Sequence, residues 1–249
     1  MSGHSKWAQI KRQKGVADAR RGQVFTKIAR EVAVAARQGG GDPDANFRLR
    51  LVIQKAREAN MPAENIERAI KRGTGGGEAA SLTEVTYEGY GPGGTAIMVE
   101  ALTDNRNRTV ADIRNLFMRA GGALGESGCV SWLFDSKGLI TVEADSADPE
   151  EVALEAIDAG AEDVKVEDST LEVHTEPQTL EAVRESLEKK GLKVSSVEMA
   201  MVPKTTVTLD EKAALQTLKL LDKLEEMDEV QHVYSNADFP DEVLEKYEG

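Results

Sequence analysis

A run of glycines divides this sequence into two parts with different hydrophobic periods. The segment Gly73-Thr74-Gly75-Gly76-Gly77 is typical of a flexible linker. Before it, apolar residues recur with the period of an α-helix, and after it short strand-like segments alternate with helical ones. We therefore predict a helical domain over residues 1–77, followed by α+β structure.

Three helices are expected in the first part. The longest spans about Ala19 to Gln38, and its apolar stripe consists of Phe25, Ile28, Val32 and Ala36. Asp42-Pro43 has the pattern of an N-cap followed by proline at the first helical position, so a second helix is predicted to begin there. Pro62 opens a third helix, and the short connections favour a small bundle.

The second part is predicted to contain two α+β domains. Residues 137–202 read strand, helix, strand, strand, helix, strand, which is the order of the ferredoxin-like split motif. Before them lie two strands, a helix from about Thr109 and a third strand at Cys129 to Phe134. After them come a strand at Thr205 to Leu209, a helix and a last strand. We expect the ferredoxin-like unit (136–203) to be inserted into a discontinuous α+β domain (78–135 and 204–249).

Charge is distributed unevenly along the chain. The formal net charge is −13, yet residues 1–75 contain 16 Lys/Arg and only 7 Asp/Glu, a net charge of +9. The rest of the chain carries a net charge of −22. Such asymmetry is typical of proteins whose basic end contacts nucleic acid, and the alternative is a solvated basic face paired against the acidic remainder.

The helix over residues 19–38 carries a basic ridge, formed by Arg20, Lys27, Arg30 and Arg37 opposite the apolar stripe. A cationic ridge neutralises phosphates and gains from counterion release, whereas a solvated helix face usually has more interspersed glutamate. The ridge and the adjacent Arg21 are therefore predicted to contact nucleic acid.

An N-terminal arm adds further positive charge through Lys6, Lys11, Arg12 and Lys14. If this stretch were a helix, its charged side chains would point in nearly every direction around the helix axis. An arm that becomes ordered when it binds its partner is therefore the better interpretation. Trp7 either stacks on a base or anchors the arm to its own domain.

A further candidate contact lies between a strand and a helix of the α+β part. There Arg106 and Arg108 would hold phosphate, while Asn105 and Asn107 would read base edges. The alternative is an ordinary helix start capped by Asp, Asn and Thr.

No catalytic site, metal site or cofactor is expected. The three histidines lack metal-ligand spacing, and neither a nucleophile elbow nor a dinucleotide motif is present. Cys129, the single cysteine, lies in an apolar context that favours a core position. With no apolar run long enough to span a membrane and no secretory signal, the chain is expected to be cytoplasmic, without a small-molecule substrate.

The sequence resembles the YebC/PmpR family, which includes the mitochondrial translational activator of cytochrome oxidase. The motifs that carry the resemblance are Gly3-His4-Ser5-Lys6-Trp7, Phe25-Thr26-Lys27, Asn60-Met61-Pro62, Tyr87-Glu88-Gly89-Tyr90-Gly91-Pro92-Gly93-Gly94 and Gly128-Cys129-Val130-Ser131-Trp132-Leu133-Phe134. The resemblance implies a helical first domain and two α+β domains, one inserted in the other. It also places nucleic-acid contact on the arm, the basic ridge, Arg106 and Arg108.

Two functions fit these expectations. Bacterial members of the family are described as DNA-binding transcriptional regulators, and other members act in translation at the ribosome, where some relieve stalling at runs of prolines. The partner is therefore expected to be DNA or ribosomal RNA. A third interpretation, a protein-interaction module that uses the acidic domains, would be favoured if reversing the basic ridge changed nothing.

Overall fold

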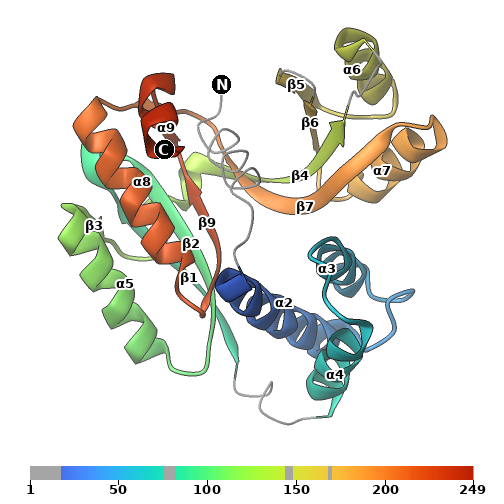
Figure 1. The fold of residues 1–249 in the computed structure, drawn as a ribbon, viewed down its shortest axis with the longest axis horizontal. Helices are drawn as coiled ribbons and strands as arrows, with labels where there is room; N and C mark the ends of the chain where they lie inside the picture. Colours follow the sequence, from blue (N-terminus) through green and yellow to red (C-terminus); the bar gives the residue numbers. More distant parts are fainter. Residues whose placement is uncertain (1–17, 76–81, 144–147, 168–169, 249) are drawn as a thin grey trace. The chain divides into compact units, whose positions relative to one another are not determined.

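The computed structural model describes residues 18–75, 82–143, 148–167 and 170–248 (Figure 1). Their contacts divide the chain into two compact units, one comprising Met1–Phe134 with Pro203–Gly249 and the other Asp135–Val202. The predicted boundary at residue 77 lies outside the described residues. The chain mixes helices with antiparallel sheets, which confirms the α+β class.

The first unit begins with three helices, which we call the helical domain: α2 (Asp18–Gly39), α3 (Phe47–Glu58) and α4 (Ala63–Thr74). Ile28 and Val32 of α2 are buried against Leu49 and Ile53 of α3 and Ile66 of α4. The structure thus confirms the first and third predicted helices and the apolar stripe.

The predicted start of the second helix was wrong. Helix α3 begins at Phe47, because Asn46 and not Asp42 is its N-cap: the Asn46 side chain accepts a hydrogen bond from the backbone N–H of Leu49 at 3.0 Å. The same buried side chain donates to the backbone carbonyls of Ala35 at 2.9 Å and Gly40 at 2.8 Å. Asn46 therefore ties the start of α3 to the end of α2, a tertiary role that a local capping pattern does not reveal.

The rest of the first unit, here called the sheet domain, is a four-stranded sheet with helices. Its main elements are β1 (Thr83–Tyr90), β2 (Ala96–Thr103), α5 (Arg106–Ala120), β3 (Ala123–Leu124), α8 (Glu211–Glu225) and β9 (Val230–Ser235). The sheet order is β3-β1-β2-β9, with every neighbouring pair antiparallel. Ile113 and Phe117 of α5 pack with Leu218 and Leu221 of α8 in the core of this domain.

Smaller elements complete the sheet domain. They are the 3-10 turns η2 (Pro92–Gly94) and η3 (Ser131–Leu133), the short parallel strands β8 (Val207–Thr208) and β10 (Ala237–Asp238), and the C-terminal helix α9 (Asp241–Glu248). The strand predicted over residues 205–209 is thus shorter than expected. Helix α5 begins three residues earlier than predicted, because Asn105 is its N-cap and accepts from the N–H of Arg108 at 3.1 Å.

The strand predicted at Cys129 to Phe134 was wrong. The carboxylate of Glu88, which is only 5% exposed, accepts hydrogen bonds from the backbone N–H groups of Gly128, Val130 and Ser131 at 2.8–2.9 Å. Three N–H groups that converge on one carboxylate cannot also form a ladder with a neighbouring strand. The segment therefore turns, and the next strand begins only at Phe134.

The second unit is the predicted ferredoxin-like domain. Its elements are β4 (Phe134–Glu143), α6 (Pro149–Asp158), β5 (Asp163–Glu167), β6 (Thr170–Thr175), α7 (Leu180–Lys189) and β7 (Lys193–Pro203). The sheet order β5-β6-β4-β7 places the first strand beside the third, as the split motif requires. Ile140 and Val173 from the sheet, together with Leu180 and Leu187 from α7, are fully buried.

Candidate nucleic-acid interface

Several predicted contact residues lie outside the described part of the chain. They are Lys6, Trp7, Lys11, Arg12 and Lys14 of the N-terminal arm. Arg20 and Arg21 lie in the first turn of α2, and nothing is described of their side chains. Their predicted contact with nucleic acid stays a prediction.

The other members of the basic ridge contact the sheet domain. Lys27 donates to the backbone carbonyl of Glu225, and Arg30 donates to that of Asp228 at 2.5 Å. Arg37 donates to the carbonyl of residue 82 at 2.9 Å. All three cations are half-buried: Lys27 and Arg30 against the acidic segment 225–229 of the same chain, and Arg37 against residue 82. Their contact with nucleic acid stays a prediction.

The helical domain neutralises a buried carboxylate internally. Glu31 of α2 is 8% exposed, and its carboxylate oxygens lie 2.9 and 3.0 Å from Nζ of Lys55 and 3.8 Å from Nε2 of His232. Burial alone would raise the pKa of Glu31, but Lys55 and His232 hold it below its usual range. One lysine of this basic domain is therefore occupied by its own carboxylate.

A groove of about 590 Å³ lies between α2 and α4. On the α2 side it is lined by Phe25, Thr26, Ala29, Arg30 and Ala33, and on the α4 side by Asn65, Arg68, Ala69 and Arg72. Met61, Leu82 and Asp104 complete the lining. Apolar side chains and guanidinium groups both line the groove, a combination that can contact the two ends of an anionic organic ligand.

Arg68 and Arg72 are the exposed cations of this groove. They stand one turn apart on α4, so both side chains lie on the same face of the helix. Within the described part of the chain, neither has a carboxylate partner. Sequence reasoning missed this pair, although its i, i+4 spacing and the shortage of acidic residues before residue 75 were signals that could have identified it.

The predicted contact at the start of α5 is partly engaged by the protein itself. Arg108 forms ion pairs with Asp104 and with Glu229, each at 2.9 Å. Arg106 is exposed, and its carbonyl accepts a hydrogen bond from the Tyr87 hydroxyl at 3.5 Å. The capping that was the alternative interpretation is present at Asn105, while contact of the two arginines with phosphate stays a prediction.

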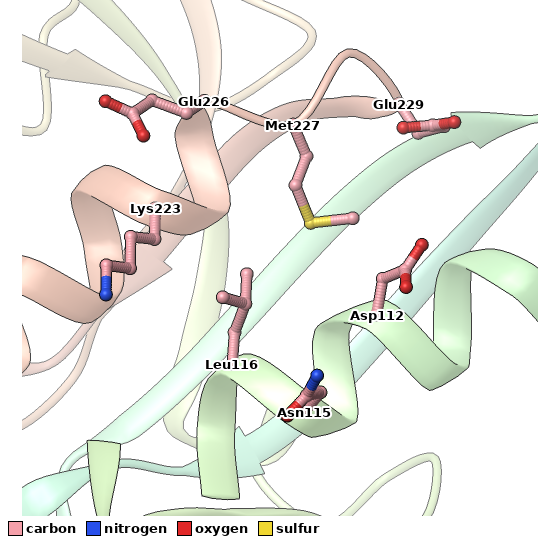
Figure 2. Close-up of a pocket in the computed structure, with 7 residues that line it drawn as sticks. All are labelled: Asp112, Asn115, Leu116, Lys223, Glu226, Met227 and Glu229. Atoms are coloured by element: carbon pink, nitrogen blue, oxygen red, sulfur yellow. The ribbon is translucent and has the colours of Figure 1, made fainter. Parts of the chain in front are cut away.

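A second hollow, of about 400 Å³, lies between α5 and α8 (Figure 2). Asp112 and Asn115 reach it from α5, and Lys223 from α8. Glu226 and Glu229 add carboxylates around an apolar base of Leu116 and Met227. Three carboxylates against one lysine make this pocket unfavourable for phosphate.

Metal clusters and membrane-spanning helices are both absent from the described residues. No cluster of three or more His, Cys, Asp or Glu side chains is arranged to bind a metal ion there. Among the helices described, none is both long and apolar enough to cross a membrane.

Comparison with known proteins identifies the family. The model of the TACO1/YebC N-terminal domain matches residues 5–76, and the model of the second and third domains of the same family matches residues 82–237. The chain belongs to the TACO1/YebC family. The resemblance seen in the sequence motifs is thereby confirmed.

TACO1/YebC relatives match almost the full length of this chain. A protein from Dehalococcoides mccartyi named "Probable transcriptional regulatory protein" is 58% identical over 99% of this chain and 98% of its own length. A protein of the same name from Herpetosiphon aurantiacus is 57% identical over 99% and 98%. The crystal structure of a conserved hypothetical protein from Aquifex aeolicus is similar with a TM-score of 0.84, at 48% identity over 90% of this chain and 93% of that one.

Proposed function

We propose that this chain is a non-enzymatic, nucleic-acid-binding regulator of gene expression, and that its target is promoter DNA. The observation that carries nucleic-acid binding is the groove between α2 and α4, where two exposed arginines lack a carboxylate partner among the described residues. The choice of promoter DNA rests on the names of the relatives. A protein with a net charge of −13 that leaves arginines unpaired in a hollow has a binding surface for anions.

The names of the relatives support a role in transcription. Proteins that are 53–58% identical over nearly the whole chain are called probable transcriptional regulatory proteins. In this proposal, the basic residues before residue 75 supply most of the affinity through phosphate contacts. The acidic remainder repels phosphate and so limits how the protein sits on the nucleic acid.

A second candidate function is a translation factor bound to ribosomal RNA. A groove between two helices suits an unpaired nucleotide, and folded RNA presents unpaired nucleotides in loops and bulges where duplex DNA does not. In this case, the same basic surface would bind the ribosome, and the sheet domain would face other parts of it.

Two binding assays with the same proteins separate these functions. We would measure the shift of promoter duplex and co-sedimentation with ribosomes, each at low and moderate salt. The variant Lys11→Glu/Arg12→Glu removes charge from the arm. Lys212→Glu/Lys219→Glu makes the same change in charge on the exposed face of α8, and is the control.

Each outcome assigns a function. A wild type that shifts the duplex, with loss in the arm variant but not in the control, supports the transcriptional role. A wild type that co-sediments with ribosomes and leaves the duplex unshifted supports the translational role. A wild type that does neither contradicts nucleic-acid binding altogether.

A further inference from the structure

We propose that the groove between α2 and α4 binds one unpaired nucleotide of a single strand. Its phosphate would lie on Arg68 and Arg72, and its base on the apolar floor. This inference rests on the proposed nucleic-acid function and specifies which part of a nucleic acid is bound. The groove volume of about 590 Å³ lies within the range of roughly 300–1,000 Å³ that small-ligand sites occupy.

The phosphate end is defined by guanidinium groups from both helices. Arg68 and Arg72 line the groove from α4, and Arg30 lines it from α2. Arg30 uses one terminal nitrogen to donate to the carbonyl of Asp228, which leaves it further N–H groups for a ligand. Planar guanidinium groups bind phosphate in a bidentate manner, so the arginines that line the groove suit a phosphate group.

The floor of the groove is apolar and contains an aromatic ring. Phe25, Ala29 and Ala33 of α2 and Met61 are apolar residues that line it. Phe25 is half-buried, so part of its ring is available to a ligand. Bases of any kind stack on aromatic side chains, and a thioether packs well against such rings.

Small residues set the distance between the two helices. A Cβ atom at Gly73 of α4 would lie 2.2 Å from the backbone oxygen of Ala33. The helices therefore touch backbone to backbone near Gly73. The groove opens on the N-terminal side of this contact in both helices, where larger side chains such as Phe25 and Arg68 line the walls.

Polar groups beside the floor can hydrogen-bond to the edge of a base. The side-chain amide of Asn65 offers both a donor and an acceptor. The exposed Asp104 carboxylate accepts hydrogen bonds, and it shares Arg108 with Glu229, each ion pair at 2.9 Å. Asp104 would disfavour a second phosphate at its end of the groove while still accepting from a base amino group.

The surroundings of α4 indicate that the groove itself holds a single strand, whereas a promoter duplex would contact the basic residues outside the groove. Helices α3 and α4 are joined by the four residues 59–62, a length also found in helix-turn-helix motifs. A recognition helix reads bases with its N-terminal residues, but there α4 exposes Glu64 and Glu67. In a duplex, moreover, stacked bases cannot enter a groove unless they are flipped out.

The test compares three fluorescent nucleic acids of equal length: single-stranded DNA, single-stranded RNA and duplex DNA. Affinity is measured by anisotropy for the full chain and for Arg68→Gln/Arg72→Gln. The matched control, Arg57→Gln/Lys71→Gln, removes two exposed cations of the same domain that do not line the groove. Thermal unfolding verifies that both variants remain folded.

We expect the groove variant to lose single-strand affinity about tenfold or more, and the control to lose no more than about threefold. Duplex affinity should fall equally in the two variants. A single strand carrying a photoreactive base should crosslink to the peptide containing Phe25 in the wild type, and Phe25→Leu should move or abolish that crosslink. Loss confined to DNA or to RNA supports the proposal and identifies the source of the nucleotide.

The proposal is overturned if the groove variant and the control lose single-strand affinity equally, or if single-strand and duplex affinity fall together in the groove variant. In either case the wild type still binds nucleic acid, so the proposed function stands. A wild type that binds none of the three nucleic acids contradicts both.

Discussion

The helical domain and the sheet domain follow the same electrostatic pattern with opposite signs. In the helical domain, the carboxylate of Glu31 is buried and paired with Lys55, so the hollow between α2 and α4 is left with unpaired arginines. In the sheet domain, Arg108 is paired with Asp104 and Glu229, and the hollow between α5 and α8 is left with an excess of carboxylates (Figure 2).

This difference teaches that the sign of a hollow is set by the charges left after internal pairing. The net charge of −13 would suggest a chain that repels nucleic acid everywhere. Instead, the hollow of the helical domain keeps exposed arginines, and the hollow of the sheet domain keeps three carboxylates against one lysine. Local charge therefore describes the binding surfaces better than the total.

The largest expected effect comes from a substitution at the backbone contact between α4 and α2, beside the groove. Gly73→Ala places a methyl group 2.2 Å from the oxygen of Ala33, and the overpacking should lower the free energy of unfolding by about 1–3 kcal/mol. Gly22→Ala in α2 meets nothing within 4 Å, so it should raise the free energy of unfolding by about 0.4–1 kcal/mol. Urea denaturation of both variants checks these signs, and a Gly73→Ala variant as stable as the wild type would disprove the close packing.

A second prediction concerns the ion pair between Glu31 and Lys55 in the helical domain. Lys55→Met leaves the Glu31 carboxylate buried without its main partner, which should cost about 1–3 kcal/mol of unfolding free energy at neutral pH. The double variant Glu31→Gln/Lys55→Met should recover most of this loss, because no charge is then buried.

The wild type and the Lys55→Met variant should differ in how their stability depends on pH. In the wild type, Lys55 and His232 outweigh burial and keep the pKa of Glu31 low, so this pair stabilises the fold above about pH 4.3 and the stabilisation is lost as the pH falls. Without Lys55, burial raises the pKa of Glu31, and the contribution should instead be lost as the pH rises. Denaturation midpoints from about pH 4 to about pH 7 should therefore show opposite trends. Parallel trends would contradict the pairing.

A third prediction concerns the salt dependence of nucleic-acid affinity. If Arg68 and Arg72 each neutralise one phosphate, the slope of log affinity against log salt should become shallower by about 1 for each arginine removed. Fluorescence anisotropy at several salt concentrations measures the slope. A reduced affinity with an unchanged slope would show that the arginines act through the fold and not through phosphate.

The smallest effect is expected at the acidic pocket. Asp112→Asn/Glu226→Gln removes two of its carboxylates and should raise nucleic-acid affinity only a few-fold, because exposed charges are screened beyond about 8 Å at physiological salt. A rise of more than about tenfold at 0.15 M salt would mean that the acidic pocket lies against the nucleic acid. The contrast between the two hollows would then be wrong.

Local patterns predicted most of the elements and failed where a distant residue decides. The apolar stripe of α2 and the order of the second unit follow from periodicity, which is local. The turn after Cys129 does not, because Glu88, about 40 residues earlier, takes the N–H groups of that segment. The apolar sequence of residues 129–134 favoured a strand, and only the tertiary contact with Glu88 excludes one.

The candidate site shows the same limit. The helical period correctly placed Lys27, Arg30 and Arg37 on one side of α2, but the carbonyls that receive them lie up to 198 residues away in the chain. The helix and the i, i+4 spacing of Arg68 and Arg72 follow from the sequence, but only the fold shows that α2 lines the same groove. Charge patterns alone cannot distinguish a cation facing its own protein from one facing a ligand.

The two ends where the second unit joins the first have a consequence for the modularity of this chain. The backbone N–H of Lys204 donates to the carbonyl of Leu133 at 2.9 Å, so the chain leaves the first unit and returns to it at nearly the same point. A short turn of a few residues could bridge this gap. The second unit could therefore be removed or replaced without changing the path of the chain in the first unit. The first unit therefore has an insertion site between Leu133 and Lys204, and this site could accept a reporter or a different binding domain.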